Sequence, residues 1–271
     1  MERSFSLEYV EDVFMTGIVW WDGDAMSTMS ASRASSNLLV LFEDNHILCV
    51  YKPAGLLSQG PSGTHNTILD ICRAWLRTRY QKQGNIYMGL VHRLDRPVGG
   101  VMVVTKTSKA ASRLSRQFRT GQVTKIYQAV VSGTPLPDHG ELSDYIRKIP
   151  GKRRSVITDT PHKGKAAMLE YETIESQQGF SLLMIRPETG RSHQIRLQLA
   201  GAGWPIAGDR KYGSEYGIER GIGLRAAEIR FTHPTKNHPV VIHAPTPPDW
   251  PWPPTDIRHL SLKRTSGRVR H

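Results

Sequence analysis

Cysteine is nearly absent from this chain, and so is any long apolar segment. Only two cysteines occur in 271 residues, Cys49 in a strand-like apolar pattern and Cys72 in a helix-like one. Two such thiols, with no CxxC or Cys/His cluster, give neither a disulfide framework nor a zinc site, and they favour a reducing compartment. No apolar run approaches the roughly 20 residues that cross a bilayer, so the sequence predicts no membrane-spanning helix and no membrane partner.

Acidic residues are scarce relative to basic ones. The chain has 24 Asp and Glu against 36 Lys and Arg, a net charge of +12 and a pI near 9.9. This excess favours a polyanion, and nucleic acid before anionic lipid, because no basic amphipathic helix stands out. A DNA-binding module would require a helix-turn-helix or finger pattern, and neither occurs. A basic chain can also be merely soluble, so charge alone does not decide the partner.

Composition divides the chain into three parts. Residues 1–37 form a peripheral extension, with a candidate edge strand at 14–21 and a small, polar, flexible stretch after it. Residues 38–248 form one folded domain, and residues 249–271 form a Pro/Trp-rich and then basic tail that could touch RNA. The acid-containing N-terminus resembles neither a secretory nor a transit peptide, so we expect the cytoplasm, with a mitochondrion or another organelle as the alternative.

Hydrophobic periodicity predicts an alternation of strands and helices. Apolar alternation predicts strands over residues 39–42, 47–51, 125–133 and 180–186 and a hairpin over 140–157 with a basic tip at 151–154, and one-sided apolar spacing predicts helices over 67–80, 108–119 and 193–200. We expect Thr107 or Ser108 to cap the second helix and Ser192 to cap the third. The second helix would show a basic face that either follows a phosphate backbone or is simply solvated, made of Lys109, Arg113, Arg116 and Arg119.

One carboxylate lies at a predicted junction of strand and turn. The stretch LVHRLDRPVGGVMVVTK, residues 90–106, places Asp95 just before a glycine-containing turn, with Arg93 and Arg96 beside it. Loops held by strands often carry catalytic groups, and an aspartate next to fixed positive charge can act as a nucleophile or general base. An isolated pattern of this kind is more often a turn with a structural ion pair, so the spacing alone does not choose.

Several motifs together resemble those of the RluA-type RNA pseudouridine synthases. HRLDRPVGG is similar to the family's H-R-L-D-x-x-T-S-G signature, with Val98 and Gly99 in place of Thr and Ser. The turn KPAG resembles N/D-K-P-x-G, with Tyr51 at the usual Asn or Asp. KIYQAVVSG, which begins at Lys125, resembles K-x-Y-x-A-x-V-x-G. Residues 190–213 resemble the family's third motif, G-R-T/S-H-Q-I-R-x-H-x-x-x-x-G-x-P-I-x-G-D-x-x-Y, with Gln198 in place of the second His.

A histidine series near the end of the domain invites a different interpretation. His233, His238 and His243 are five residues apart, but the first two precede proline in a segment of turn composition, which does not favour a metal site. The segment is similar to the family's closing F-x-H-P…A-P hairpin. We therefore expect a hairpin here and no metal.

The resemblance implies a fold, an activity and site residues. The implied fold is α+β: one catalytic domain with a bent, mixed, largely antiparallel sheet, flanked by helices and loops around a central cleft. The implied catalytic residues are Asp95, Tyr127 packed on the target uracil, and Arg191 paired with Asp95, with Arg196 as the competing candidate for that pairing. The implied substrate-binding residues are His92, Arg93, Arg96, Lys125 and Arg196. The implied reaction needs no cofactor.

The implied chemistry agrees with the acids that the sequence offers. Pseudouridine formation detaches uracil from its ribose and rejoins it through carbon 5, after the uridine has been flipped out of the RNA. A glycosidase would typically need two working carboxylates, and the sequence offers one well-placed acid. We expect a monomer acting on ribosomal rather than transfer RNA, alone or in pre-ribosomal particles. The alternative is a catalytically silent RNA-binding or ribosome-assembly factor on the same fold, suggested by the altered residues 98–99.

Overall fold

The computed structural model describes residues 38–60, 66–152 and 154–252, so the predicted N-terminal edge strand, the flexible stretch and the basic arm lie outside it. The helices are α2 (Ile68–Tyr80), α3 (Ser108–Arg119), α4 (Gln194–Gly201) and the short 3-10 helix η4 (Arg210–Tyr212). The strands are β1 (Val40–Glu43), β2 (Ile47–Lys52), β3 (Gly89–Leu90), β4 (Gly99–Thr105), β5 (Thr124–Ser132), β6 (His139–Lys148), β7 (Ser155–Thr158), β8 (Lys165–Gln177), β9 (Phe180–Pro187), β10 (Leu224–Thr232) and β11 (Pro239–His243).

One sheet contains every strand of the described chain. Its 11 strands follow the order β1-β2-β4-β10-β5-β9-β8-β6-β7, with β11 added to β10 and β3 added to β4. All neighbours are antiparallel except β10 and β4, which are parallel. The predicted α+β class with a mixed, largely antiparallel sheet is therefore confirmed.

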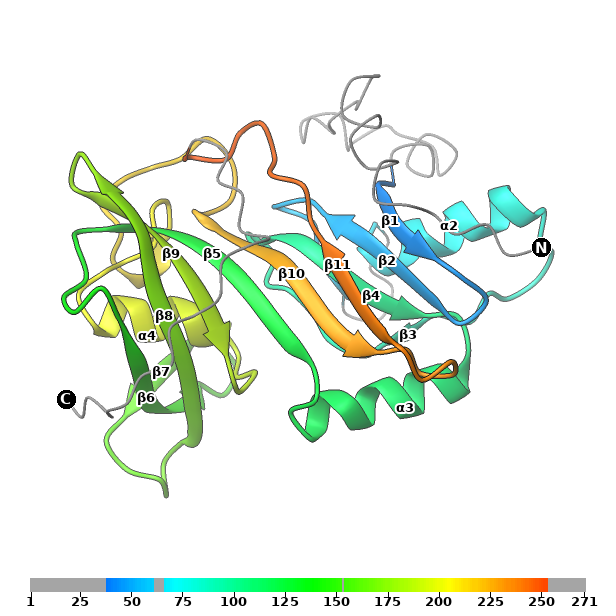
Figure 1. Cartoon of the computed structure of the whole chain (residues 1–271), viewed down its shortest axis with the longest axis horizontal. Helices are drawn as coiled ribbons and strands as arrows, with labels where there is room; N and C mark the ends of the chain where they lie inside the picture. The colour runs from blue at the N-terminus through cyan, green and yellow to red at the C-terminus, as the bar shows by residue number, and fades with distance from the viewer. Residues whose placement is uncertain (1–37, 61–65, 153, 253–271) are drawn as a thin grey trace.

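The sheet consists of two halves joined by β10. Strands β1 to β4 with helices α2 and α3 form one half, and β5 to β9 with α4 form the other (Figure 1). At the junction, Gly100 lies against the backbone of Ala226, and a Cβ on Gly100 would be 2.2 Å from the Ala226 carbonyl oxygen. Since no other residue can approach backbone so closely, glycine is required where the halves meet.

Of the two predicted helix caps, one is confirmed and one is wrong. Thr67 and Asp70 form a capping box at α2, and Thr107 caps α3. The predicted Ser192 cap of α4 is wrong, because the helix begins after His193, which has a left-handed φ of 59° and no capping bond from its side chain. No helix in the described ranges is long and apolar enough to cross a membrane.

The packed domain continues past the predicted boundary at residue 248. Trp252 is buried against Val130 and Leu182, and its Nε1 donates a hydrogen bond to Glu175 Oε2 at 2.9 Å. The segment has no regular structure, as its prolines predicted, yet it covers part of the sheet. The two tryptophans of this segment thus belong with the domain, because burying an indole and satisfying its N–H stabilises the contact.

Candidate active site

Asp95 lies in the loop between β3 and β4, at the junction of the two halves of the sheet. Its side chain is 26% exposed, and its Oδ2 is 3.2 Å from Arg196 Nη1 and 3.8 Å from His193 Nε2. Both partners come from the start of α4, about a hundred residues later in the chain. A carboxylate from one half thus meets two nitrogen-bearing side chains from the other half.

The turn after β2 holds the Asp95 loop through its backbone. Gly55 N donates to Arg96 O at 2.8 Å, and Arg96 Nε donates to Gly55 O at 2.9 Å. Ser58 Oγ both donates to Leu94 O, at 2.7 Å, and accepts from Leu94 N, at 3.1 Å. These reciprocal bonds fix Leu94 and Arg96, the residues on either side of Asp95. They therefore fix the position of Asp95 as well.

Lys52 also holds the backbone around Asp95. It is fully buried, and its Nζ donates to the carbonyl oxygens of Pro53, Leu56 and Arg96 at 2.9, 2.7 and 3.3 Å. Burial lowers the pKa of Lys52 to about 7, while the charge of Asp95 acts in the opposite direction. Three carbonyl acceptors match the three donors of an ammonium group, so the lysine binds the first motif to the Asp95 loop.

Arg196 is positioned by a second carboxylate, Asp209, whose two oxygens both accept hydrogen bonds from it. Its Nε and Nη2 donate to Asp209 Oδ2 and Oδ1 at 2.6 and 2.7 Å, and its guanidinium lies 4.9 Å from the centre of the Tyr212 ring. Asp209 is only 2% exposed. A bidentate pair fixes the plane of the guanidinium, and the third nitrogen is then directed at Asp95. Asp95 is therefore the carboxylate that remains open for chemistry.

The predicted pairing of Arg191 with Asp95 is wrong, and the competing candidate Arg196 makes it instead. Arg191 is exposed, and its Nε donates to Ala166 O at 2.8 Å, on β8. Gln194 sets this direction, since its Oε1 accepts from Arg191 N at 2.9 Å while its Nε2 donates to Met168 O at 2.9 Å. The turn thus directs Arg191 outward along β8, and the helix directs Arg196 inward.

His193 connects Asp95 to η4. Its Nδ1 lies 2.5 Å from the Tyr212 hydroxyl, and its left-handed backbone turns the ring toward the carboxylate. Burial lowers the pKa of His193, and the nearby Asp95 opposes that shift. A non-glycine residue in this conformation is uncommon and occurs most often at functional sites, which favours a positioning role.

Tyr127 and Lys125 project from β5, beside the Asp95 loop. Burial raises the pKa of Tyr127 above its usual range, and the negative charge of Asp95 raises it further. Burial also lowers the pKa of Lys125. A neutral phenol near the carboxylate offers a flat face and a hydroxyl proton, which suits contact with a base. The predicted roles of both residues toward RNA remain predictions.

The two residues before Leu94 have different surroundings. His92 Nε2 accepts a hydrogen bond from Val103 N at 2.9 Å, and its ring stacks on Phe118 with centroids 4.9 Å apart. Burial, aided by Lys125, lowers the pKa of His92 to about 3, so it is neutral at pH 7. Its described contacts are structural, and its predicted contact with substrate stays a prediction. Arg93 is exposed and forms no ion pair with any described residue, so it remains a candidate for RNA contact.

The departures from the family signature have a structural basis. Val98 is buried, and its N–H donates to Asp95 O at 3.1 Å, which closes the turn after Asp95. Gly99 lies against Tyr51, and a Cβ on Gly99 would be 3.0 Å from the Tyr51 hydroxyl oxygen. The two unusual residues, Tyr51 and Gly99, are thus neighbours across β2 and β4. The larger side chain on one strand accompanies the missing side chain on the other.

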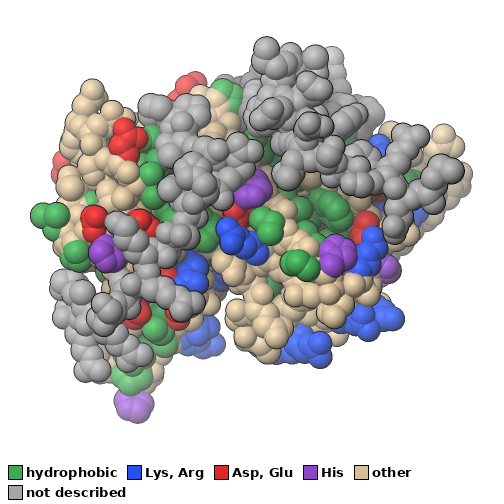
Figure 2. Space-filling model, in the orientation of Figure 1, with side chains coloured by type: hydrophobic (Ala, Val, Ile, Leu, Met, Phe, Trp, Pro, Cys, Tyr) green, Lys and Arg blue, Asp and Glu red, His purple; other side chains and the backbone are tan. Residues whose placement is uncertain are grey.

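Basic side chains also gather away from Asp95, on α3. Lys109, Arg113, Arg116 and Arg119 are exposed there, and Figure 2 shows Lys and Arg side chains along the edge of the molecule where α3 lies. Arg113 has a structural bond as well, since its Nη1 donates to Pro234 O at 2.9 Å. This face is available to a polyanion, as predicted, although nothing in the fold requires that use.

Sequence reasoning missed four residues of this site: Lys52, His193, Asp209 and Tyr212. All four lie inside the motifs quoted above, in KPAG, in the S-H-Q-I-R segment and in G-D-x-x-Y. Their identity was visible in the sequence, but their contacts depend on how three separate loops converge. Among the described residues, no group of three or more His, Cys, Asp or Glu could hold a metal ion.

The fold and the site together present one partly exposed carboxylate held by a guanidinium, which a second, buried carboxylate orients. The chain matches the RNA pseudouridylate synthase family over residues 46–201, more than half its length, and it belongs to that family. It is therefore an RNA pseudouridine synthase, an isomerase that acts on RNA.

Curated relatives and solved structures agree with this assignment. The chain is 33% identical over 230 residues to the ribosomal large subunit pseudouridine synthase C of Vibrio cholerae, covering 81% of this chain and 69% of that protein. It is 30% identical over 224 residues to the ribosomal large subunit pseudouridine synthase D of Zymomonas mobilis, covering 78% of this chain and 70% of that protein. The human RNA pseudouridylate synthase domain-containing protein 4 has the same fold, with a TM-score of 0.66, 23% identity, and coverage of 81% and 92% of the two chains.

Proposed function

We propose that this enzyme isomerises one or a few uridines of large-subunit ribosomal RNA. The relatives named above, types C and D, are described as acting on the large ribosomal subunit. The net charge of +12 favours a partner of high phosphate density. Transfer RNA is the second candidate substrate. The enzyme acts as a monomer in this proposal, on free RNA or on pre-ribosomal particles.

Asp95 carries the reaction in this proposal. The bond between uracil N1 and ribose C1′ breaks, the base turns, and a bond between uracil C5 and C1′ forms. The proton leaves C5 and N1 gains one, so atoms balance without a cofactor. Asp95 acts as the nucleophile or as the base that assists detachment, and attack at the sugar, attack on the ring and elimination all remain open routes.

The neighbours of Asp95 suit these steps. Arg196 donates from Nη1 at 3.2 Å and keeps the carboxylate oriented, because Asp209 holds the other side of its guanidinium. Tyr127 packs on the uracil face, and its raised pKa keeps it protonated and able to donate. One observation carries the proposal. Asp95 and Asp209 both pair with Arg196, but Asp95 is partly exposed while Asp209 is buried. One open carboxylate suits isomerisation better than hydrolysis.

A silent RNA-binding factor is the weaker candidate. Its support was the altered signature at Val98 and Gly99, yet the turn bond from Val98 N to Asp95 O is kept. The cytoplasm is the proposed compartment, and the two buried free thiols, Cys49 and Cys72, suit a reducing environment.

The test is site-by-site pseudouridine mapping of total RNA from cells that express wild-type protein or Asp95→Asn. We expect one or a few large-subunit ribosomal sites to disappear with Asp95→Asn, and the purified wild-type protein to restore them on a transcript. Sites lost only from transfer RNA would correct the substrate. Unchanged sites with Asp95→Asn, in a protein that melts like the wild type, would overturn the role of Asp95.

A further inference from the structure

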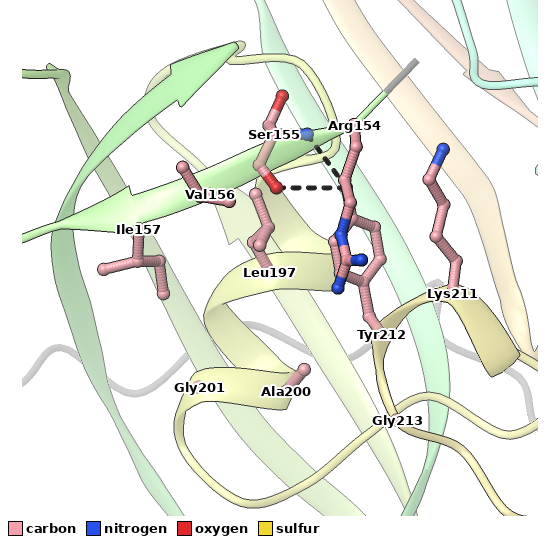
Figure 3. A pocket seen from close by; sticks show the side chains of 10 residues that line it. All are labelled: Arg154, Ser155, Val156, Ile157, Leu197, Ala200, Gly201, Lys211, Tyr212 and Gly213. Carbon is pink, nitrogen blue, oxygen red and sulfur yellow. Dashed lines mark hydrogen bonds between the residues drawn. The ribbon is translucent and has the colours of Figure 1, made fainter. Parts of the chain in front are cut away.

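An open pocket lies beside Tyr212. It has a volume of about 380 Å³ and is formed by β7, α4 and η4 (Figure 3). This volume is within the range of about 300–1,000 Å³ that small-molecule sites occupy. Its lining residues are Arg154, Ser155, Val156, Ile157, Leu197, Ala200, Gly201, Lys211, Tyr212 and Gly213.

The pocket combines an apolar floor with two cations. Ile157, Leu197 and Ala200, from β7 and α4, form this apolar floor, and Arg154 and Lys211 add positive charge. The Arg154 guanidinium lies 5.7 Å from the centre of the Tyr212 ring, which orients it. Apolar surface beside a positive cluster matches the chemistry of a nucleotide, whose base and sugar are largely apolar on their faces and whose phosphate is an anion.

Tyr212 forms the wall between this pocket and the active site. Its ring has the Arg154 guanidinium at 5.7 Å and the Arg196 guanidinium at 4.9 Å. Its hydroxyl accepts from Ser155 N at 3.2 Å and contacts His193 Nδ1 at 2.5 Å. The pocket and Asp95 are thus linked through Tyr212 and the residues bonded to it.

We propose that this pocket binds a nucleotide adjoining the target uridine, with Arg154 and Lys211 holding its phosphodiester and the apolar floor receiving its sugar and base. The proposal rests on the proposed function, because it assumes that a uridine occupies the site at Asp95. It assigns the β6–β7 hairpin and η4 a role in choosing which uridine reaches that site. A nucleotide in this pocket would contact Tyr212, whose hydroxyl contacts His193 beside Asp95.

The first test measures RNA affinity with Asp95→Asn protein, so that no chemistry interferes. The probes are a short oligouridine and a hairpin that carries the mapped uridine. Arg154→Met should weaken binding about tenfold and lower the slope of log affinity against log salt by about 0.7, the loss expected for one phosphate contact on a single strand. Lys163→Met, an exposed lysine in the turn before β8, is the matched control and should change affinity by less than about twofold. Equal losses in Arg154→Met and Lys163→Met would overturn the proposal.

The second test locates the contact. One phosphodiester at a time is replaced by a neutral methylphosphonate in the hairpin, on either side of the target. At the linkage that the pocket holds, Arg154→Met and Lys211→Met should cause no further loss. If their effect is the same at every linkage, the charges act at long range and the proposal is wrong.

The third test addresses the apolar floor and separates the two proposals. Ala200→Leu should raise KM without lowering kcat, and an abasic nucleotide at the adjoining position should restore the wild-type KM. A protein that binds with these dependences but forms no pseudouridine would contradict the proposed function and retain the pocket. An active enzyme whose KM is unchanged by Arg154→Met and Ala200→Leu would contradict the pocket proposal and retain the proposed function.

Discussion

The two halves of the sheet hold their parts of the active site in different ways. In the half with β1 to β4, several separate bonds hold the backbone of the Asp95 loop, one from Gly55 N and others from the side chains of Ser58 and Lys52. In the half with β5 to β9, charged side chains hold one another, through Arg196 and Asp209. Bonds that are spread over several partners survive the loss of one partner, whereas an ion pair depends on both members.

This difference shows where the site is vulnerable. Asp95 should keep its position when single neighbouring side chains change, because its loop is held at several backbone atoms. Arg196 should lose its position when Asp209 changes shape or charge, because a buried guanidinium needs paired acceptors. The following substitutions compare the two halves.

Arg196→Lys should have the largest effect. A lysine cannot contact Asp209 through two nitrogens and still reach Asp95, so we expect kcat to fall by about 100-fold or more, as when a preorganised donor is removed. Arg191→Lys is the matched control, and it should stay within about twofold because Arg191 is exposed. Single-turnover pseudouridine formation measures both. A crippled Arg191→Lys beside an active Arg196→Lys would restore the pairing that the sequence suggested.

Asp209→Asn should affect stability more than Asp95→Asn. Breaking the buried pair leaves Arg196 with an uncompensated charge, which costs about 3–5 kcal/mol. Asp95 is 26% exposed and contacts Arg196 through one oxygen, and an asparagine carbonyl can replace that contact. We expect Asp95→Asn to change the free energy of unfolding by less than about 1 kcal/mol. Urea denaturation measures both free energies of unfolding. Equal losses would show that Asp95 and Asp209 contribute equally to stability.

Local chemistry made much of the fold predictable. The strands β2 and β5 and the cap at Thr107 depend on residues close in sequence, and each lies where the pattern indicated. The start of α4 did not follow this rule. Ser192 has the right side chain for a cap, but the chain turns at His193 to bring that ring near Asp95. Tertiary contact outweighed local preference there.

The candidate site was predictable in part for the same reason. Asp95 was identified because a family signature surrounds it, and the domain fold followed from the same resemblance. The choice between Arg191 and Arg196 could not be made from spacing, since it depends on Gln194 binding the Met168 carbonyl on β8. Asp209 and Lys52 were hidden for a similar reason, because their partners are distant in sequence.

Gly99→Ser tests how the backbone-held half tolerates a new side chain. The serine Cβ would lie 3.0 Å from the Tyr51 hydroxyl oxygen, so we expect a loss of about 1–2 kcal/mol in the free energy of unfolding. In a Tyr51→Phe background the hydroxyl is gone, and the loss should shrink by at least about 0.5 kcal/mol. A double-mutant cycle by thermal denaturation gives this coupling. Additive losses would mean that Tyr51 and Gly99 did not adapt to each other.

His92 gives the smallest effect, and it depends on pH. The folded-state pKa of His92 is lowered to about 3 by burial and then by Lys125, and protonation would also remove the acceptor that Val103 N uses. The unfolded chain binds the proton near pH 6.5, so the unfolded state holds more protons between pH 6.5 and 3, and stability falls as pH falls through that window.

At pH 5 this linkage should cost about 1–2 kcal/mol relative to pH 7. His92→Gln retains an acceptor for Val103 N but does not titrate, so the difference between wild type and this variant isolates His92 from the other histidines. Urea denaturation of both proteins from pH 7 to 5 measures it. If the two pH profiles are parallel, the pKa of His92 is the same in the folded and the unfolded state, and its burial beside β4 does not exclude the proton.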